Sequence, residues 1–436
     1  MSNALMYLAG VLLFTVGVAA SIGLHEIGHL VPGKLYNVKI TQYFVGFGRT
    51  LWSRRRGETE YGLKAIPLGG YVKLVGMLPP APDQDPDRVR TSNTGIFAQL
   101  VSDARSAEYE HVDPEDHDRL FYRLPWWKRV VIMGSGVTIN LVIAFGLFAV
   151  VFMGYGIHGA TTTVGSVSRC VKVVETGHPA GACTAQDPVT PALAAGLEPG
   201  DRIVEFNGAA IDDYADLQRR IRANEAGAAE IVVERGGKTL TLHTNTTVNG
   251  LPSLDDPEKT VKAGFLGIRP AVERQRQGVG YVVSTMADGT WQTLKSIGAM
   301  PQKVYHVSRA ALGLEERDIN SPMSVVGAGR VAGEFASDDG SSVADRFFSL
   351  LLLLAGLNLF LGLINLVPLP PFDGAGIATT LYEAVRRGVA RVLGRPDPGA
   401  VDAAKLLPVT YVVATLLLVM TAILVYADIV APVSIS

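Results

Sequence analysis

Four long runs without a charged side chain divide this chain. The runs cover Ala4–Leu24, Val130–Gly154, Phe347–Phe372 and Leu406–Ala427. Each is about as long as the roughly 20 apolar residues that a membrane-spanning helix needs. The first run lacks the basic start and the small-residue cleavage site of a signal peptide, so it is interpreted as a span as well. The pattern predicts a polytopic α-helical membrane protein with four transmembrane helices.

Shorter alternating segments replace the long runs between the second and third spans. Asp213–Arg222 has the spacing of a helix, with Leu217 and Ile221 on one face. Three segments have the period of strands, namely Val164–Val167, Arg202–Phe206 and Glu230–Glu234. We therefore expect a soluble module here, mainly β with a helix.

Two further segments have patterns of their own. Residues 286–312 carry apolar side chains at three- and four-residue steps, which predicts an amphipathic helix kinked at Pro301. We expect this helix to lie against the soluble module or the outer membrane face. Residues 78–121 contain prolines and many acidic side chains, which is typical of a linker or insert.

The composition is an average over these two kinds of sequence. The 436 residues are 48% hydrophobic and 18% charged, whereas soluble domains are about 25% charged. Such a chain is too apolar for intrinsic disorder. Its net charge of −2 gives no electrostatic basis for binding nucleic acid.

Lysine and arginine are distributed unevenly between the segments that join the spans. Residues 380–405 are rich in arginine, and eight basic residues lie between positions 33 and 73: Lys34, Lys39, Arg49, Arg54, Arg55, Arg56, Lys64 and Lys73. Basic segments stay on the cytoplasmic side of a membrane. We therefore expect residues 32–129 and 373–405 inside, and residues 155–345 and both termini outside.

The two cysteines, Cys170 and Cys183, fall in the soluble module. Outside the cytoplasm a disulfide between them would persist, and it would stabilise the module by roughly 3 kcal/mol. We favour this disulfide, and two buried free thiols are the alternative. Their spacing does not match a metal-binding cysteine pair.

The first span ends in the motif His25-Glu26-Ile27-Gly28-His29, which is an HExxH sequence. On a helix the two histidines share one face and can bind one zinc ion, and Glu26 can act as a general base on water. Ionisable residues at membrane depth are costly and usually functional. The motif therefore predicts a catalytic zinc site.

A catalytic zinc site needs a third protein ligand. No Asp or Glu occurs between Glu26 and Glu58, so the third ligand must come from a distant part of the chain. Asp373 is the candidate that directly ends the third apolar run, within Asn365-Leu-Val-Pro368-Leu-Pro370-Pro-Phe-Asp373-Gly374. Its prolines cannot continue a regular helix, and irregular backbone at membrane depth is tolerated where it lines a cavity.

The stretch Pro191–Gly208 resembles a PDZ domain of the permuted kind found in bacterial proteases. Gly200-Asp201 and Asn207-Gly208 are turn pairs that bracket a buried strand. The resemblance implies a groove headed by Phe265–Ile268, with Val164–Val167 as its edge strand, that accepts a peptide by strand addition. Alternatively, the module binds no ligand and serves only as a packing and spacing element.

The HExxH span, the distant NxxPxPxxDG motif and the module between spans two and three together resemble the site-2 protease family, peptidase M50. The similarity covers nearly the whole chain and is closest to the RseP-like bacterial branch with its actinobacterial members. It implies an intramembrane zinc metalloprotease with one catalytic Zn²⁺. The implied ligands are His25, His29 and Asp373, with Glu26 catalytic and Asn365 holding the substrate or the developing oxyanion.

Two glycine-rich segments, Tyr43–Gly48 and Ile66–Leu74, resemble the membrane-re-entrant β-hairpin of this family. A substrate helix must unwind before it is hydrolysed, and an exposed strand could pair with the unwound stretch. The alternative is a hairpin that only plugs the cavity. On this resemblance we expect substrate contacts from Gly46, Gly48, Asn140, Pro368 and Pro370 as well as Asn365.

The chain departs from the family pattern at three points. Phe372-Asp-Gly-Ala375 replaces the usual Leu-Asp-Gly-Gly, Gly136-Val-Thr-Ile-Asn140 lacks a proline, and Phe360 stands where some relatives have asparagine. None of these changes removes a predicted zinc ligand or the predicted base.

The expected organisation follows from the spans and the resemblance. The segments are 1–31, the first span with HExxH; 32–77, the re-entrant hairpin region; 78–129, a cytoplasmic linker or insert; 130–154, the second span; 155–270, an extracytoplasmic PDZ domain; 271–345, an outer amphipathic-helix region; 346–372, the third span; 373–405, a cytoplasmic loop; and 406–428, the fourth span.

The expected function is regulated intramembrane proteolysis in the cell membrane. The resemblance implies single-span membrane substrates already trimmed outside by another protease, with anti-sigma factors leading and signal-peptide remnants as another possibility. Membrane lipid and a peptide ligand of the PDZ domain are the other expected partners. Two other functions would use parts of the same sequence: zinc transport or delivery, and a catalytically inactive PDZ scaffold.

Overall fold

The structure is a computed structural model that describes residues 3–79, 114–172, 183–184, 186–254, 259–318 and 320–433. Most of the 78–121 segment, expected to be a linker or insert, lies outside these ranges. Contacts divide the chain into two compact units. Unit 1 comprises Met1–Tyr155 and Gly278–Ser436, and unit 2 comprises Gly156–Gln277.

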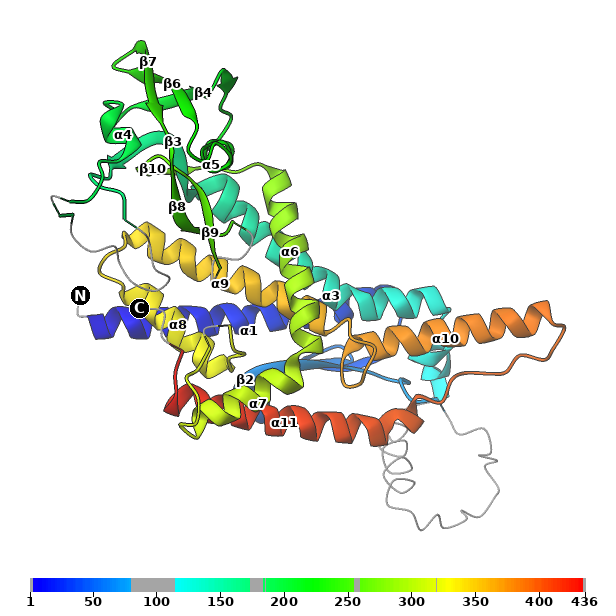
Figure 1. Ribbon diagram of the computed structural model, residues 1–436. Coiled ribbons are helices and arrows are strands. Elements are labelled where there is room, and N and C mark those ends of the chain that lie inside the picture. Colours follow the sequence, from blue (N-terminus) through cyan, green and yellow to red (C-terminus); the bar gives the residue numbers. More distant parts are fainter. Residues whose placement is uncertain are drawn as a thin grey trace. The chain divides into compact units, whose positions relative to one another are not determined.

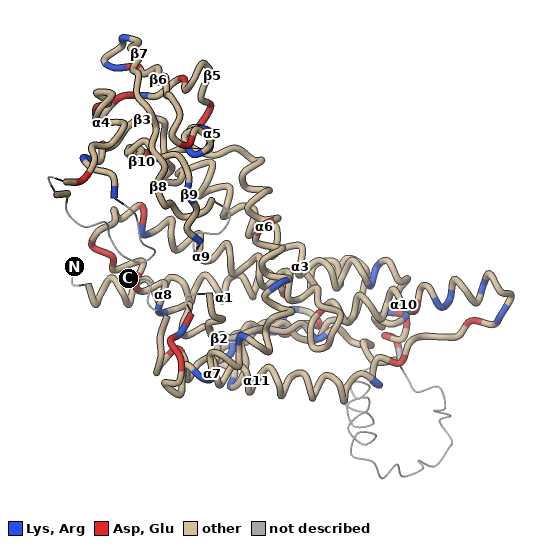
Figure 2. Tube along the Cα trace, viewed as in Figure 1, with Lys and Arg blue, Asp and Glu red and all other residues tan. Residues whose placement is uncertain are grey.

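Four helices of unit 1 are long and apolar enough to cross a membrane, among the residues that are described. They are α1 (Asn3–Leu35), α3 (Trp126–Ala149), α9 (Val343–Ile364) and α11 (Leu407–Val430). A π-helical turn, Val150–Tyr155, prolongs α3, and a short 3₁₀ turn, Ala403–Leu406, precedes α11. Figure 2 shows long stretches of all four helices without charged residues. The four predicted spans correspond to these helices.

The third span ends earlier than the apolar run predicted. Helix α9 stops at Ile364, and the proline-containing residues 365–372 form turns. Most of the expected cytoplasmic loop 373–405 is instead a helix, α10 (Asp373–Val392). The helix contains charged side chains, so it does not form an uncharged run. Its apolar residues recur with the period of an amphipathic surface helix instead.

Small residues let α1 pack closely against its neighbours (Figure 1). A Cβ added to Gly28 would lie 2.7 Å from the Cα of Gly136 on α3. A Cβ added to Gly10 would lie 2.6 Å from the carbonyl oxygen of Ala332, in the helix α8 (Val325–Ser337). Helices in membranes associate largely through such close backbone approach.

A buried ion pair attaches α10 to α3. Arg129 donates to both carboxylate oxygens of Glu383, at 2.6 and 3.2 Å, and the N–H of Val401 donates to Glu383 at 3.0 Å. Arg129 and Glu383 are 5% and 2% exposed. Burial alone would raise the pKa of Glu383, but the bonds from Arg129 and Val401 outweigh it and hold the pKa below its usual value.

Strands β1 (Ile40–Arg56) and β2 (Thr59–Leu74) form a folded-back hairpin. Val45 pairs with Gly70 on one side and with Leu63 on the other. The first part of β1 therefore lies between the two halves of β2. The hydroxyl of Tyr43 donates to the carbonyl oxygen of Gly23 at 2.9 Å and joins the hairpin to α1. Two 3₁₀ turns, Pro114–Arg119 and Phe121–Arg123, lead on to α3.

The expected amphipathic helix over residues 286–312 is two helices. Ala299 caps the end of helix α6 (Val279–Gly298), and Pro301 lies in the first turn of α7 (Met300–Ala311), where its missing N–H is not needed. Both helices belong to unit 1 and not to the soluble module. A Cβ on Gly289 would lie 2.9 Å from Leu359 of α9, and Val307 packs with Leu424 of α11. The sequence did not predict α8.

Unit 2 is built on one main sheet with the strand order β10-β3-β4-β6-β7. A further short strand pairs with β4, and two strands form a separate hairpin. In chain order the elements are β3 (Ile157–Val167), α4 (Pro191–Ala194), β4 (Arg202–Phe206), β5 (Ala209–Ala210), α5 (Tyr214–Ala223), β6 (Ala228–Arg235), β7 (Lys238–Asn245), β8 (Thr247–Pro252), β9 (Thr260–Phe265) and β10 (Ile268–Gln275).

The core of unit 2 contains Leu217 and Ile221 of α5, as their spacing predicted. Asp213 accepts a hydrogen bond from the N–H of Asp216 and caps this helix. A disulfide joins Cys170 to Cys183. The structure therefore has the disulfide that the sequence favoured over free thiols.

The expectation that Val164–Val167 forms the sheet edge is wrong. Val164 pairs with Pro270 and Val167 with Ile268, so β3 lies inside the sheet and β10 at its edge. The turn at Gly267, with φ of +93°, leads directly into β10. Strand β10 therefore pairs with β3 on the outer side of the sheet. A small pocket of about 150 Å³ lies between α5 and Phe265–Ile268.

The Arg129–Glu383 pair generates a stability prediction. Replacing Arg129 with alanine leaves Glu383 buried without its main partner and should lower the free energy of unfolding by about 3–5 kcal/mol. The measurement is chemical unfolding of the purified protein in detergent. Because the pKa of Glu383 is lowered, the loss should be full above its unfolded pKa and shrink on acidification, as Glu383 becomes protonated.

Arg387 provides the matched control. Its guanidinium also lies near Glu383, at 3.4 Å, but its side chain is 38% exposed. Arg387→Ala should cost less than about 1 kcal/mol. Equal losses for the two variants would contradict this account of the buried pair.

Candidate metal centre

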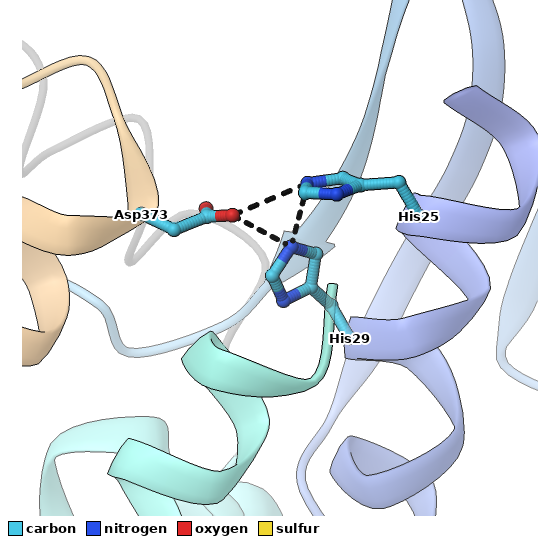
Figure 3. Close-up of side chains that lie close together, drawn as sticks. All are labelled: His25, His29 and Asp373. Carbon is cyan, nitrogen blue, oxygen red and sulfur yellow. Dashed lines mark hydrogen bonds and ion pairs between the residues drawn. The ribbon is translucent and has the colours of Figure 1, made fainter. Parts of the chain in front are cut away.

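Two histidines and one aspartate converge where α1 meets the start of α10 (Figure 3). His25 and His29 are one helical turn apart, and their Nε2 atoms lie 3.2 Å from each other. Oδ2 of Asp373 lies 3.2 Å from each of these nitrogens. The structure therefore brings together the three residues that the sequence proposed as ligands.

The triangle of donor atoms fits a tetrahedral zinc ion. Zinc binds nitrogen and oxygen at about 2.0–2.1 Å, which places neighbouring donors of a tetrahedron about 3.3 Å apart. The three observed separations are each 3.2 Å. Oδ2 of Asp373 is buried and accepts no hydrogen bond from the part of the chain that is described. A cation bound by these three atoms would satisfy all of them.

The outer nitrogens of both imidazoles are also engaged. Nδ1–H of His29 donates to the carbonyl oxygen of Ile132 at 2.8 Å, which leaves Nε2 as the lone-pair donor. Nδ1 of His25 lies 3.2 Å from the amide of Asn140. Turning this amide by half a turn would place its otherwise unpartnered oxygen against Nδ1–H. Asn140 is 1% exposed, so the contact is shielded from water.

Gly136 of α3 lies directly beneath the two histidines. A Cβ at this position would lie 2.7 Å from Cε1 of His29 and 2.9 Å from Cε1 of His25. In the sequence, Gly136 stands out only as part of the motif Gly136-Val-Thr-Ile-Asn140, and no role was predicted for it. The signal available was its four-residue spacing from Asn140, which places both residues on one helix face.

The loop after α9 places Asp373 opposite the histidines. The N–H of Gly374 donates to the carbonyl oxygen of Asn365 at 2.7 Å and closes the loop. A side chain on Gly374 would collide with the carbonyl oxygens of Leu366 and Val367. The proline-rich segment thus folds back on itself and delivers Asp373 as the first residue of α10.

A cavity of about 490 Å³ opens beside the three donors. Glu26 lines it, and so does Val72 of β2. A Cβ on Gly70 would lie 3.0 Å from Cγ of Glu26, so β2 approaches this residue closely. The polar wall of the cavity includes His25, Glu26, His29, Asn140, Asn365 and Asp373, and the strand wall includes Gly69, Gly70, Tyr71 and Val72.

The residues predicted to bind substrate lie in different places. Asn365 and Asn140 line the cavity, whereas Pro368 and Pro370 are not among its lining residues and Pro371 is. Gly46 and Gly48 have φ of +93° and +83° and shape β1, while Gly69 and Gly70 of β2 line the cavity. The substrate contacts of all six residues remain predictions.

An HExxH helix and a distant carboxylate that meet within an apolar helical bundle define the class of membrane zinc metallopeptidases. The comparison with known proteins agrees. The profile of peptidase family M50 matches residues 13–393. The chain belongs to this family, the site-2 proteases, and is a multi-pass membrane zinc metalloprotease.

The relatives cover almost the whole chain. Zinc metalloprotease Rip1 of Mycobacterium tuberculosis is 34% identical over 440 residues, which is 98% of this chain and 99% of the relative. Rip1 of Mycolicibacterium smegmatis is 32% identical over 99% of this chain and 100% of its own. Metalloprotease MmpA of Caulobacter vibrioides is 28% identical over 86% of each chain.

The position of Gly136 generates a prediction about metal binding. A methyl group in Gly136→Ala would displace the imidazoles of His25 and His29. We expect this variant to lose most of its zinc and its proteolytic activity. The measurement is zinc content per protein by elemental mass spectrometry.

Gly134 of the same helix provides the matched control, because a Cβ there would meet nothing within 4 Å. Gly134→Ala should keep its zinc. A Gly136→Ala variant with full zinc content would show that the histidines tolerate the added methyl group.

Proposed function

We propose that this protein is an intramembrane endopeptidase that cleaves single-span membrane proteins. In this proposal His25, His29 and Asp373 hold one zinc ion, and Glu26 is the catalytic base. The observation that carries the assignment is the triangle of donor atoms, each 3.2 Å from the others, beside a cavity lined by Glu26.

The proposed reaction is hydrolysis of a peptide bond by water. When bound, zinc supplies Lewis acidity to the attacking water and to the scissile carbonyl. Glu26 takes the proton from the water and later delivers it to the leaving amine. The contact of Asn140 with His25 favours a role in orienting that ligand, in addition to its predicted substrate contact.

We further propose that β2 holds the unwound substrate. Gly70–Val72 pairs with β1 on one side, and on the other side it pairs with no strand of the described ranges. Its backbone lines the cavity next to Glu26, so an added strand would pass the catalytic group. Asn365, on the opposite wall, can donate its amide to the substrate carbonyl or the developing oxyanion.

The proposed orientation places the active site toward the cytoplasm. His25 and His29 directly follow the uncharged run of the first span. The basic residues of β1 come after the first span, and those of α10 come after the third span, α9. The positive-inside rule then places unit 2 on the extracytoplasmic side of the cell membrane. The hairpin β1–β2 would enter the membrane from the cytoplasmic face beside the active site.

Regulated intramembrane proteolysis is the proposed physiological role. Anti-sigma factors are the leading substrate class, and signal-peptide remnants are a second. Unit 2 would act as a PDZ domain that binds a peptide at β10 and, with α6 and α7, excludes substrates with large outer domains. The groove between α5 and Phe265–Ile268 supports the peptide role.

Replacement of Glu26 by glutamine tests the catalytic assignment. Glutamine keeps the size of the side chain but cannot accept the proton of water. We expect Glu26→Gln to retain zinc and to lose cleavage of a tagged single-span substrate by about 10²–10⁴-fold. The assay uses the full-length protein in proteoliposomes, with gel analysis of the products.

This comparison also tests the other two functions. Zinc transport would need the three ligands but not a base, so both forms would move zinc and cleave nothing. An inactive scaffold would bind peptide and cleave nothing in either form. Equal cleavage by wild type and Glu26→Gln would contradict the assignment of the base.

Replacement of residues 164–268 with a short flexible linker tests the proposed exclusion of large substrates. Wild-type protein should cleave a substrate whose outer domain has been removed and should spare the intact one. The shortened protein should cleave both. Unchanged discrimination, with retained cleavage of the trimmed substrate, would show that unit 2 is not the filter.

A further inference from the structure

A basic pocket lies on the hairpin, formed by residues that the catalytic proposal does not use. Trp52, Arg54 and Arg56 alternate along β1 and therefore share one face of the strand. Tyr61 lies opposite Arg54 in the neighbouring strand, and Lys34 comes from the last turn of α1. Together with Gly57 these residues line a surface pocket of about 630 Å³.

The three cations of this pocket have no acidic partner within the described part of the chain. Neither Lys34, Arg54 nor Arg56 forms an ion pair there, and no acidic side chain lines the pocket. Glu58, the nearest acid along the hairpin, pairs with Arg119 at 2.7 Å. Three positive charges around one hollow repel one another, and an anion bound between them would remove that cost.

Contacts within the pocket already hold one of the cations in place. Nζ of Lys34 donates to the hydroxyl of Tyr61 at 2.6 Å and lies 5.2 Å from the centre of its ring. The ammonium group keeps two donors for a ligand. Arg54 and Arg56 can each present a planar pair of donors, the geometry that matches phosphate oxygens.

The level of the pocket relative to the spans indicates where its ligand comes from. Tyr36, just after α1, contacts the ring of Trp127 at 5.7 Å, and Nζ of Lys128 lies over both rings. The uncharged run of α3 starts at Val130. The end of α1 is therefore level with the boundary of the apolar region, where tryptophan, tyrosine and lysine gather at the headgroups of a bilayer.

Apolar side chains beside the pocket favour a lipid over a soluble anion. Leu35, which follows Lys34 in the chain, is 77% exposed, and Trp52 in the pocket is 55% exposed. An exposed leucine and a tryptophan next to three cations provide a surface for acyl chains beside a site for a phosphate. A soluble phosphate would use the cations alone.

We propose that the pocket formed by Lys34, Trp52, Arg54, Arg56, Gly57 and Tyr61 binds the phosphate headgroup of an anionic phospholipid. The cations hold the phosphate oxygens, and the acyl chains lie along Leu35 and Trp52. A bound lipid would hold the tip of the hairpin at the headgroup level. The other end of β2 lines the metal cavity, so the lipid would also restrict the strand that approaches Glu26.

The test measures lipid binding directly and needs no cleavage, so its result is independent of the proposed catalytic function. Full-length protein in detergent is titrated with phosphatidylglycerol, and the bound fraction is read by native mass spectrometry. Each removed arginine should weaken binding roughly fivefold. Arg54→Gln and Arg56→Gln should therefore each lower the affinity by about that factor, and the double variant by about 25-fold.

Arg55 provides the matched control. It lies between the two arginines but on the opposite face of the strand, across from Glu60, and does not line the pocket. Arg55→Gln removes the same charge and should leave the affinity almost unchanged. An equal loss for Arg55→Gln would mean that diffuse charge, and not the pocket, binds the lipid, and would overturn the proposal.

Two further titrations identify the source of the phosphate. Phosphatidylcholine should bind much more weakly, and inorganic phosphate should compete only poorly with phosphatidylglycerol. Equal binding of phosphatidylcholine, or displacement by inorganic phosphate at concentrations similar to those of the lipid, would overturn the lipid assignment.

A fluorescence measurement that leaves both arginines in place covers the case in which an arginine variant fails to fold. Brominated phosphatidylglycerol should quench tryptophan fluorescence more in wild type than in Trp52→Phe, because Trp52 lines the pocket. Brominated phosphatidylcholine should not show this difference. Identical quenching of both proteins by the anionic lipid would overturn the proposal.

Discussion

The close approach of α1 and α3 is the constraint on which the metal centre depends. Gly28 and Gly136 bring the two backbones together at the level of the HExxH motif. This contact places the carbonyl oxygen of Ile132 and the amide of Asn140 behind the histidines. A side chain at either glycine would separate the helices or displace the ligands. The donors are therefore oriented by the packing of two spans as well as by their own helix.

Two buried ion pairs join parts of unit 1 that are far apart in the sequence. Arg129 pairs with Glu383, and Arg317 pairs with Asp428 at 2.6 Å. Asp428 also accepts from the N–H and hydroxyl of Ser324 at 2.7 and 2.6 Å, which attaches the start of α8 to α11. Desolvating these charges is costly, and the bonds offset that cost while fixing which helices pack together.

Local patterns in the sequence predicted much of this architecture. Uncharged runs located the spans, because the bilayer requires them, and the HExxH spacing placed two ligands on one helix face. Asp373 could be proposed because it ends an apolar run. Helix α8 was not predicted. Pro301 predicted a kink in one helix, and the structure has a break between two helices at Ala299. The edge position of β10 follows from strand pairing and not from its own residues.

The ligand set has a consequence for the order in which the protein is made. On the proposed assignment, His25 and His29 leave the ribosome early, but Asp373 follows the third span. Two histidines alone provide a weak zinc site. The growing chain would therefore remain without a hydrolytic centre until α9 has been inserted and its following loop has folded back. A membrane protease built this way cannot cut neighbouring nascent chains during its own synthesis.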